Sequence, residues 1–464
     1  MRLRGPVVLY QPREREGVMP LGLLHLGSAL AGQPVVIVDG RLDLAPEARV
    51  AGLAREALCL GVTVRSGRNI GDALRISRAV RSANPVLPIV WGGGHPTILP
   101  AQCLTSEAVD ACAMGPGEET LGELVAALRA ECLSPDLAGL AWRRGEEVVI
   151  GPPRASADAA RAARADYKLL DLEHYFRVRG ARRLDYCSSR RPWPDQPPPQ
   201  PGWSGLPAER VVAELRDLAG RLRITEVSFQ DEDFFAEPRR AEAIARGLLE
   251  AGVHFAWSAA GSAAALGRMA PEAFRAVAAS GCSRVDVRPP AEAVLGGEEA
   301  EAILEAARRL RVAGIVGRFA FTAGFPGRGK AGLAEIQRLI RALRRIDPRC
   351  EAPIWLHAPH PGGPGAMPPG FPVPERLEDW IGAGLEVPGR WVPDALRRRA
   401  SRLQFFFGEA GRPPGGGMGK RLLRLVARAR VRLGFYGLDL ERHAVEGAAR
   451  IRTGRSRPQV GAQD

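Results

Sequence analysis

Short apolar segments alternate with helical ones five times in the first 130 residues, and this alternation constrains the fold more than any other feature of the chain. The apolar runs are continuous, as expected of strands buried on both faces of a parallel sheet. They predict a doubly wound, Rossmann-like α/β sheet. The expected strands are Pro6–Tyr10, Pro34–Asp39, Leu58–Val64, Val86–Trp91 and Val109–Ala113. The expected helices are Leu21–Ala31, Ala45–Glu56, Ile70–Ala83, Ile98–Thr105 and Glu118–Ala130.

Two glycine-rich loops follow the fourth and fifth expected strands. They read WGGGHPT at Trp91–Thr97 and MGPGEET at Met114–Thr120. Right-handed crossovers bring the carboxyl ends of parallel strands to one edge of a sheet, where ligands bind. Consecutive glycines let a ligand approach the backbone, and a helix N-terminus attracts anions. A tight turn would explain either loop alone, but two such loops on one edge favour a ligand site.

These loops, with PLGLLHLGSAL and VVIVDG before them, resemble the cobalamin-binding domain of B12-dependent radical SAM proteins. That family includes the anaerobic Mg-protoporphyrin ester cyclase and many methyltransferases. The resemblance implies a flavodoxin-like sheet whose edge can hold cobalamin. It implies cobalamin contacts at Thr63, Gly92, Gly93, Gly94, Gly115 and Glu118. The Asp-x-His-x-x-Gly motif that supplies a cobalt ligand in other B12 proteins is absent, and the matching loop reads QPREREG. We interpret His95, which precedes a proline at a helix start, as structural.

Residues 131–184 are expected to form a connector with a β-hairpin around Arg144-Gly145. Strand–helix alternation resumes between 185 and 375 and predicts a partial (β/α) barrel of the TIM type, whose chemistry belongs at the carboxyl ends of the strands. The expected strands are Glu226–Gln230, His254–Ser258, Arg284–Arg288, Gly317–Thr322 and Ile354–His357. The segments WSGLPAERVVAEL, VSFQDEDFF and FTAGFPG resemble the radical SAM core of the same family.

The loop Asp185–Trp203, DYCSSRRPWPDQPPPQPGW, departs from that family. An active member holds a [4Fe–4S] cluster with three cysteines spaced C-x-x-x-C-x-x-C, whereas this loop has one thiol, Cys187, and six prolines. Alignment of Ser189-Arg190 with the family places Cys187 before the first ligand position. Cys282 and Cys350 precede predicted strands, at the opposite end of the barrel. Since thiolates hold such clusters, the sequence predicts that the cluster and S-adenosylmethionine are absent.

A second departure lies at Val287–Ala291, which reads VRPPA where the family has a Gly-x-Glu-Ser-Gly segment that contacts the nucleoside. The acidic run Asp231, Glu232 and Asp233 is retained. Two interpretations of it remain open. It contacts a substrate or cofactor amine at a strand end, or it caps a helix with solvated carboxylates.

Positive charge is concentrated in the C-terminal region, 376–464. Residues 390–464 hold 17 Lys or Arg against 6 Asp or Glu, most of the net charge of +13. Residues 419–435 predict a basic amphipathic helix, with Leu422, Leu425, Ala429 and Leu433 on one face. We expect this face to pack on the barrel; attachment to anionic lipid or to an acidic partner are the alternatives. Nucleic-acid binding is not supported, because no binding module accompanies the charge.

The chain is therefore interpreted as a diverged member of this family without radical SAM catalysis. It would act as a cobalamin-binding or accessory subunit, with an active homologue or an acidic protein as partner. One alternative is an active B12-dependent methyltransferase or cyclase with unconventional cluster ligands or a sequence error in the loop. Another is an enzyme using cobalamin or a metal without SAM, for which Asp231 and His360 are the first residues to replace. His357 and His360 could face the same cavity, but a metal site needs a third ligand, which the sequence does not identify. Seven cysteines without close pairs and the lack of a signal peptide predict a cytoplasmic protein, with membrane contact only at the periphery.

Overall fold

The computed structural model describes residues 5–13, 18–30, 32–132, 137–155, 159–190, 203–289, 295–357, 374–382, 392–411 and 418–433, together with Tyr436 and Glu441. By internal contacts the chain forms two compact units. The first comprises Met1–Val285 and Ala358–Arg390, and the second comprises Asp286–His357 and Trp391–Asp464. The expected domain boundaries at 130, 184 and 375 follow sequence similarity and stay predictions.

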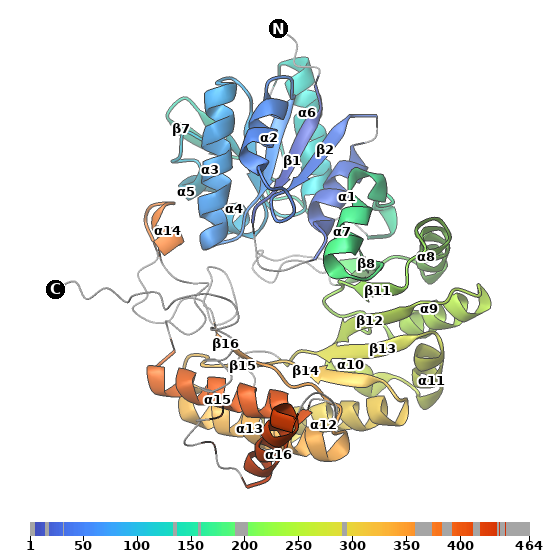
Figure 1. The fold of residues 1–464 in the computed structure, drawn as a ribbon. Helices are drawn as coiled ribbons and strands as arrows, with labels where there is room; N and C mark the ends of the chain where they lie inside the picture. Colours follow the sequence, from blue (N-terminus) through green and yellow to red (C-terminus); the bar gives the residue numbers. More distant parts are fainter. Residues whose placement is uncertain are drawn as a thin grey trace, which may run out of the picture. The chain divides into compact units, whose positions relative to one another are not determined.

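The first unit begins with a seven-stranded sheet in the order β2-β1-β3-β4-β5-β6-β7 (Figure 1). Its first five strands run parallel in the flavodoxin-like order, which confirms the predicted α/β fold. These strands are β1 Val7–Gln11, β2 Val35–Asp39, β3 Cys59–Thr63, β4 Ile89–Gly92 and β5 Ala111–Ala113. The predicted hairpin, β6 Leu140–Arg144 and β7 Glu147–Ile150, extends the sheet antiparallel to β5.

Helices cover both faces of this sheet, so successive side chains of β1 enter two different cores. Val8 and Tyr10 join a core with residues of α2 and α3, whereas Val7 and Leu9 join a core with residues of α1 and α6. This two-sided burial explains why the strands read as continuous apolar runs. The helices are α1 Leu21–Ala29, α2 Pro46–Ala54, α3 Arg68–Ala83, α6 Gly117–Ala130 and α14 Asp379–Gly382, the last packed on α3.

The expected helix at Ile98–Thr105 is wrong. The chain forms two short helices there, α4 Gly94–Ile98 and α5 Pro100–Cys103. Leu99 between them has an extended φ of −127°. Pro100 has no amide hydrogen to continue the first helix, and its fixed φ suits the first turn of the second.

The first unit continues with strands in the order β13-β12-β11-β8, of which β8, β11 and β12 run parallel. They are β8 Arg183–Tyr186, β11 Glu226–Phe229, β12 Ala256–Gly261 and β13 Cys282–Val287. Helices alternate with them, as the predicted partial barrel requires. These are α7 Leu172–Arg179, α8 Ala208–Leu222, α9 Pro238–Glu250, α10 Ala263–Arg268 and α11 Pro271–Ala279. The rings of Phe229, Phe234 and Trp257 pack together in the core, with centroids 4.6–5.5 Å apart.

The second unit carries α12 Gly297–Val312, β14 Val316–Phe319, β15 Phe321–Ala323, α13 Gly329–Ile346, β16 Ile354–Leu356, α15 Asp394–Gly411 and α16 Met418–Leu433. The expected single strand Gly317–Thr322 is two strands, β14 and β15, separated at Ala320. β15 pairs in parallel with β16. Phe319, Phe321, Phe406 and Phe407 of this unit are fully buried.

One buried carboxylate, Asp185 on β8, joins the two parts of the first unit. The Met19 amide, just before α1, donates to Asp185 Oδ2 at 2.7 Å. The Arg179 guanidinium at the end of α7 contacts the same oxygen at 2.5 Å, and both side chains are nearly inaccessible, 7% and 2% exposed. The Tyr167 hydroxyl donates to the Asp185 carbonyl at 2.7 Å. The chain before α1, the end of α7 and β8 are therefore held by the same residue.

We expect Asp185→Ala to lower the free energy of unfolding by about 3–5 kcal/mol, because it leaves the buried Arg179 guanidinium without its carboxylate. Urea unfolding followed by circular dichroism measures the loss. Asp217→Ala is the matched control, since Asp217 pairs with Arg221 on the exposed face of α8 and should unfold close to wild type. Equal loss in both variants would contradict the special role of Asp185.

Candidate functional site

The carboxyl edge of the seven-stranded sheet carries the predicted ligand loops. Thr63 ends β3, Gly92 ends β4, and Gly94 begins α4. Gly93 has a φ of +97°, and a Cβ placed there would lie 3.0 Å from the Val64 carbonyl oxygen and 3.1 Å from Thr63 Oγ1. Only glycine fits at this position. A Cβ at Gly92 would have its nearest neighbour at 3.8 Å, so packing alone does not require glycine there.

Thr97, which the sequence reasoning did not single out, ties the two glycine loops together. Its hydroxyl donates to the Gly93 carbonyl at 2.8 Å and accepts from the Gly115 amide at 3.0 Å. Gly115 has a φ of +72°, a conformation that favours glycine. The structure thus brings Thr63, Gly93 and Gly115 to one edge. A threonine one turn into the short helix after the first loop is the signal that could have identified this link.

His95 is buried beneath this edge, with 1% of its surface exposed. Its Nδ1 lies 2.9 Å from Ser66 Oγ, and its ring meets Trp380 edge-on, with centroids 5.1 Å apart. This packing agrees with the structural interpretation of His95.

Glu118, in the first turn of α6, is engaged by an arginine from the distant loop after β8. Arg190 Nη2 lies 2.6 Å from Glu118 Oε1, and each side chain is 24% exposed. The ion pair connects the predicted cobalamin edge with the start of the loop where the family holds its cluster. Any ligand contact made by Glu118 has to be shared with Arg190.

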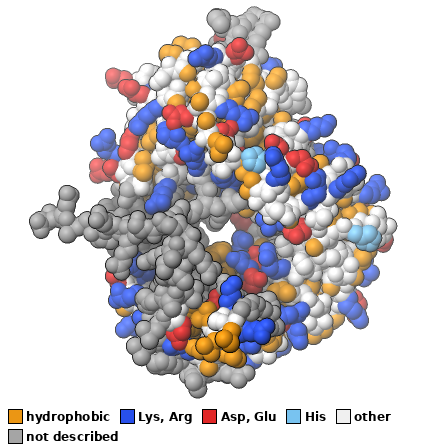
Figure 2. Space-filling model, in the orientation of Figure 1, with side chains coloured by type: hydrophobic (Ala, Val, Ile, Leu, Met, Phe, Trp, Pro, Cys, Tyr) orange, Lys and Arg blue, Asp and Glu red, His pale blue; other side chains and the backbone are white. Residues whose placement is uncertain are grey.

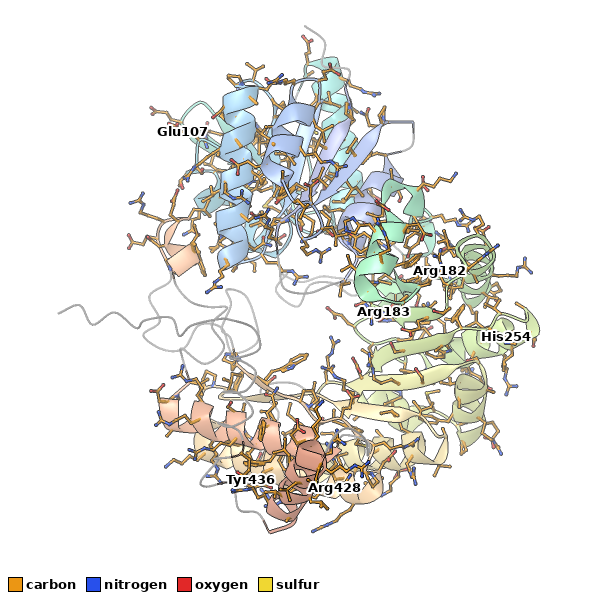
Figure 3. All side chains as sticks on the ribbon, in the orientation of Figure 1. Glu107, Arg182, Arg183, His254, Arg428 and Tyr436 are labelled. Atoms are coloured by element: carbon orange, nitrogen blue, oxygen red, sulfur yellow. The ribbon has the colours of Figure 1, made fainter. Side chains whose placement is uncertain are left out.

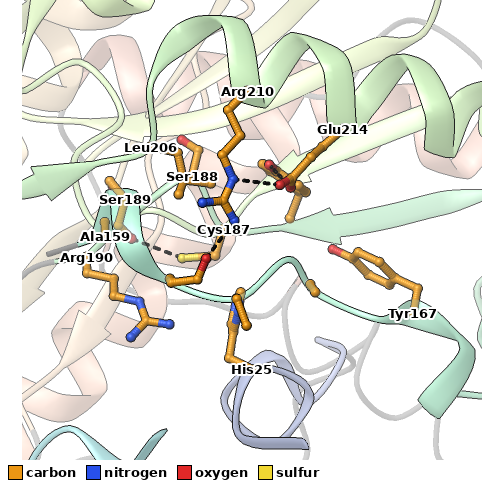
Figure 4. Close-up of a pocket in the computed structure, with 14 residues that line it drawn as sticks. His25, Ala159, Tyr167, Cys187, Ser188, Ser189, Arg190, Leu206, Arg210 and Glu214 are labelled. Atoms are coloured by element: carbon orange, nitrogen blue, oxygen red, sulfur yellow. Dashed lines mark hydrogen bonds and ion pairs between the residues drawn. The ribbon is translucent and has the colours of Figure 1, made fainter. Parts of the chain in front are cut away.

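The chain directly after β8 is folded against itself. The Cys187 thiol donates to the Ser189 carbonyl at 3.1 Å (Figure 4). Burial, together with the nearby Asp231 carboxylate, raises the pKa of the Cys187 thiol to about 12. The group is therefore a protonated thiol near neutral pH, a form that is a poor nucleophile and a poor metal ligand. The rest of the predicted cluster loop, residues 191–202, lies outside the described residues.

Asp231, which follows β11, holds this segment in place. It accepts hydrogen bonds from the Ser188 amide at 3.2 Å and the Ser188 hydroxyl at 3.0 Å, and also from the Ser189 hydroxyl. Its burial raises its pKa despite these donors. Glu232 is exposed, and Asp233 Oδ1 accepts from the Phe235 amide at 3.1 Å. The three acids therefore have different environments, which a run of like residues in a sequence does not reveal.

A small cavity of about 20 Å³ lies beside Cys187, large enough for roughly one water molecule. One wall is an ion pair on α8, in which Arg210 Nε lies 2.9 Å from Glu214 Oε1. Glu214 also accepts from the Tyr186 hydroxyl at 2.7 Å. His25 reaches the cavity from α1, and Tyr167 lines it as well (Figure 4). Sequence reasoning missed these residues because they come from four segments that lie far apart in the sequence.

Within the described part of the chain, the buried Nδ1 atom of His25 has no hydrogen-bond partner. Burial, and then the positive charge of Arg190, lower its pKa to about 4. The imidazole is therefore neutral at neutral pH.

The remaining cysteines and histidines considered from the sequence have other surroundings. Cys282 and Cys350 are buried. The His357 ring meets Phe325 with centroids 5.0 Å apart. His360 lies outside the described residues, as do residues 290 and 291 of the second departing loop. Within the described ranges no three His, Cys, Asp or Glu side chains are arranged to hold a metal ion.

Cys187 should resist alkylation by iodoacetamide at pH 8, since its raised pKa leaves almost no thiolate and its side chain is only partly accessible. Cys132, which is exposed, supplies the internal comparison. Peptide mass spectrometry of the native protein should find Cys132 modified and Cys187 intact, with both modified after denaturation. Rapid native labelling of Cys187 would contradict the buried position.

His25 should make the protein less stable in mild acid. Its folded pKa of about 4 lies below the ordinary 6.5, so the unfolded chain takes up the proton first. Stability is complete above about pH 6.5 and falls by up to about 3 kcal/mol as the pH approaches 4. In urea titrations at pH 7.5 and 5, His25→Gln should lose less stability than wild type. His254→Gln, at an exposed histidine, should behave as wild type does.

Comparison with known proteins identifies the first domain. Residues 16–125 match the family model described as the B12 binding domain. The uncharacterized methyltransferase PH0819 of Pyrococcus horikoshii is 24% identical over 365 residues, which cover 74% of this chain and 76% of that protein. The anaerobic magnesium-protoporphyrin IX monomethyl ester cyclase of Synechocystis sp. is 28% identical over 200 residues, which cover 39% of this chain and 40% of that protein.

Two solved structures share the fold. TsrM from Kitasatospora setae, a radical S-adenosylmethionine methyltransferase with cobalamin and a [4Fe–4S] cluster bound, aligns with a TM-score of 0.65 and 17% identity. That alignment covers 91% of this chain and 99% of TsrM. OxsB, a cobalamin-dependent S-adenosylmethionine radical enzyme, aligns with a TM-score of 0.62 and 19% identity over 73% of this chain and 52% of OxsB. The predicted resemblance to B12-binding radical SAM proteins is confirmed.

Proposed function

We propose that this chain, whose residues 16–125 form a B12-binding domain, binds cobalamin without catalysing radical SAM chemistry, as a cobalamin-binding or accessory subunit. The observation that carries the second half of the proposal is the state of the chain after β8. Its thiol, Cys187, is partly buried and donates a hydrogen bond to the chain's own backbone. In the whole sequence, no two cysteines lie within eight residues of each other.

The residues at the edge of the first sheet fit cobalamin. Gly93 and Gly115 have positive φ angles, which favour glycine and so leave both loops without a side chain at these positions. Thr97 links the two loops by hydrogen bonds. Gly92 has room for a side chain but carries none, as expected where a bulky ligand approaches the backbone. Thr63, Gly92, Gly93, Gly94, Gly115 and Glu118 are the residues proposed to hold it. Bound cobalamin would supply a cobalt centre able to carry a methyl group.

The residues after β8 do not fit a [4Fe–4S] cluster. Such clusters are held by several thiolates, and the sequence from 185 to 203 contains a single cysteine, Cys187. Asp231, which would be free to meet a substrate amine in an active site, is instead committed to Ser188 and Ser189. We derive no step through a cluster or through S-adenosylmethionine.

An active radical SAM enzyme is the competing proposal. The alignment with TsrM over nearly the full length of both chains favours it, since TsrM holds both cofactors. It requires unconventional ligands or an error in the reported sequence within residues 191–202. Resequencing those codons separates the two proposals most cheaply. An accessory role implies a partner, either an active homologue or an acidic protein, in a reducing cytoplasm suited to seven free cysteines.

Anaerobic reconstitution with iron, sulfide and hydroxocobalamin tests the proposal. The protein should retain about one cobalamin per chain after desalting and show no cluster absorbance near ~400 nm. About four irons per chain with that absorbance would falsify the loss of the cluster.

A glycine variant tests where cobalamin binds. Gly92→Val should weaken cobalamin binding by roughly tenfold or more if the ligand touches this backbone, equivalent to about 1.4 kcal/mol. Gly52→Val on the outer face of α2, where a Cβ meets nothing within 4 Å, is the control. Equal cobalamin affinity in wild type and both variants would place the ligand elsewhere.

A further inference from the structure

Helix α16 carries basic side chains and no acidic one. Its sequence, MGKRLLRLVARARVRL, holds Lys420, Arg421, Arg424, Arg428, Arg430 and Arg432. Neither the B12-binding domain nor the β8 loop accounts for this composition. The helix belongs to the second unit, so its role is separate from the sites described above.

The apolar side chains of α16 form an exposed stripe. Met418, Leu422 and Leu425 are 87%, 62% and 61% exposed, and Ala429 is exposed as well. Spacings of four, three and four residues place them on one helical face. We expected this face to pack on the barrel, and for these residues that expectation is wrong. The physical reason is that α16 has a second, narrower apolar face that makes the contact instead.

The opposite face of α16 fixes its orientation. Ala427 is fully buried, and Leu423 and Val431, one turn before and after it, are partly buried. α16 packs extensively against α15. Arg430 lies 2.8 Å from Glu441, and its guanidinium sits 4.9 Å from the centre of the Phe406 ring. These contacts hold the helix so that the stripe points outward.

Exposed cations accompany the stripe. Lys420, Arg421 and Arg428 are all exposed, and Arg421 and Arg428 lie on the flank next to Leu422 and Leu425. Figure 2 shows hydrophobic side chains gathered beside Lys and Arg side chains at the place that α16 occupies in Figure 1. Figure 3 labels Arg428 and Tyr436 in the same part of the second unit.

We propose that this face of α16 docks in the plane of an anionic lipid bilayer. Met418, Leu422 and Leu425 would enter the boundary between headgroups and acyl chains, and the flanking cations would meet lipid phosphates. Arginine side chains are long enough to keep their charge at the headgroups while the helix sinks below them. Contact is peripheral, because no helix among the described residues is long and apolar enough to cross a membrane.

The geometry favours a bilayer over a folded protein partner. A specific protein interface buries on the order of 800 Å² on each side and has few charges at its centre. The stripe is narrow, and the exposed cations Arg421 and Arg428 border it on one flank. An anionic bilayer is fluid and carries diffuse negative charge, so it can bind this pattern without a surface of complementary shape.

The experiment is flotation of the full-length protein with vesicles. Phosphatidylcholine vesicles should bind little protein, and vesicles containing roughly 30% phosphatidylglycerol should bind it in a salt-sensitive manner. The double variant Leu422→Asp/Leu425→Asp should lower partitioning at least about tenfold. Arg421→Gln/Arg428→Gln should lower it about fivefold per arginine.

Controls keep the outcome interpretable. Val312→Asp changes an apolar residue of the same unit that is 89% exposed but lies on α12, and it should bind as wild type does. The α16 leucines are exposed, so their replacement should leave the thermal unfolding transition in place. Undiminished vesicle binding by the leucine variant overturns the proposal. So does a wild-type protein that ignores anionic vesicles but self-associates through α16 in sedimentation velocity. Cobalamin retention should be the same in every variant, so this proposal and the proposed function fail independently.

Discussion

A single buried carboxylate, Asp185, ties the chain before α1 to the first strand of the partial barrel. It is the point at which the Met19 amide, the Arg179 guanidinium and the first strand of the partial barrel meet. A charge removed from water is tolerated only when its partners satisfy it, so each of these contacts depends on the others being present. Their joint geometry sets the position of the chain that leaves β8. The Cys187 segment, the cavity and the ion pair to Glu118 all follow from that position.

The order of strands and helices in the first domain could be predicted because each strand carries the same local pattern, a continuous apolar run. Strands buried on both faces have no polar alternation, and β1 shows why, with Val8 and Leu9 entering opposite cores. The glycine loops could also be predicted from the sequence, since a side chain at Gly93 would collide with the backbone of Val64. The break at Leu99 was missed because Pro100 fits equally well inside the first turn of a new helix.

Other parts of the site depend on contacts between distant segments, which periodicity does not encode. His25, Arg190 and Glu214 come from α1, β9 (Ser189–Arg190) and α8, and only the tertiary fold gathers them. The sequence does not show that Asp231 has partners, whereas in the structure its carboxylate accepts hydrogen bonds from Ser188 and Ser189, which follow another strand. Helix α16 shows the same limit. Amphipathicity identifies an apolar face, but it does not say whether that face meets the protein or its surroundings.

The distribution of thiols affects how the purified protein will behave in air. Five cysteines are buried and Cys187 is enclosed, which leaves Cys132, just beyond the end of α6, as the exposed thiol. Oxidation would therefore join two copies through this residue without disturbing either core. A covalent dimer on a non-reducing gel would report storage chemistry, and biological association has to be judged with Cys132 reduced or replaced by serine.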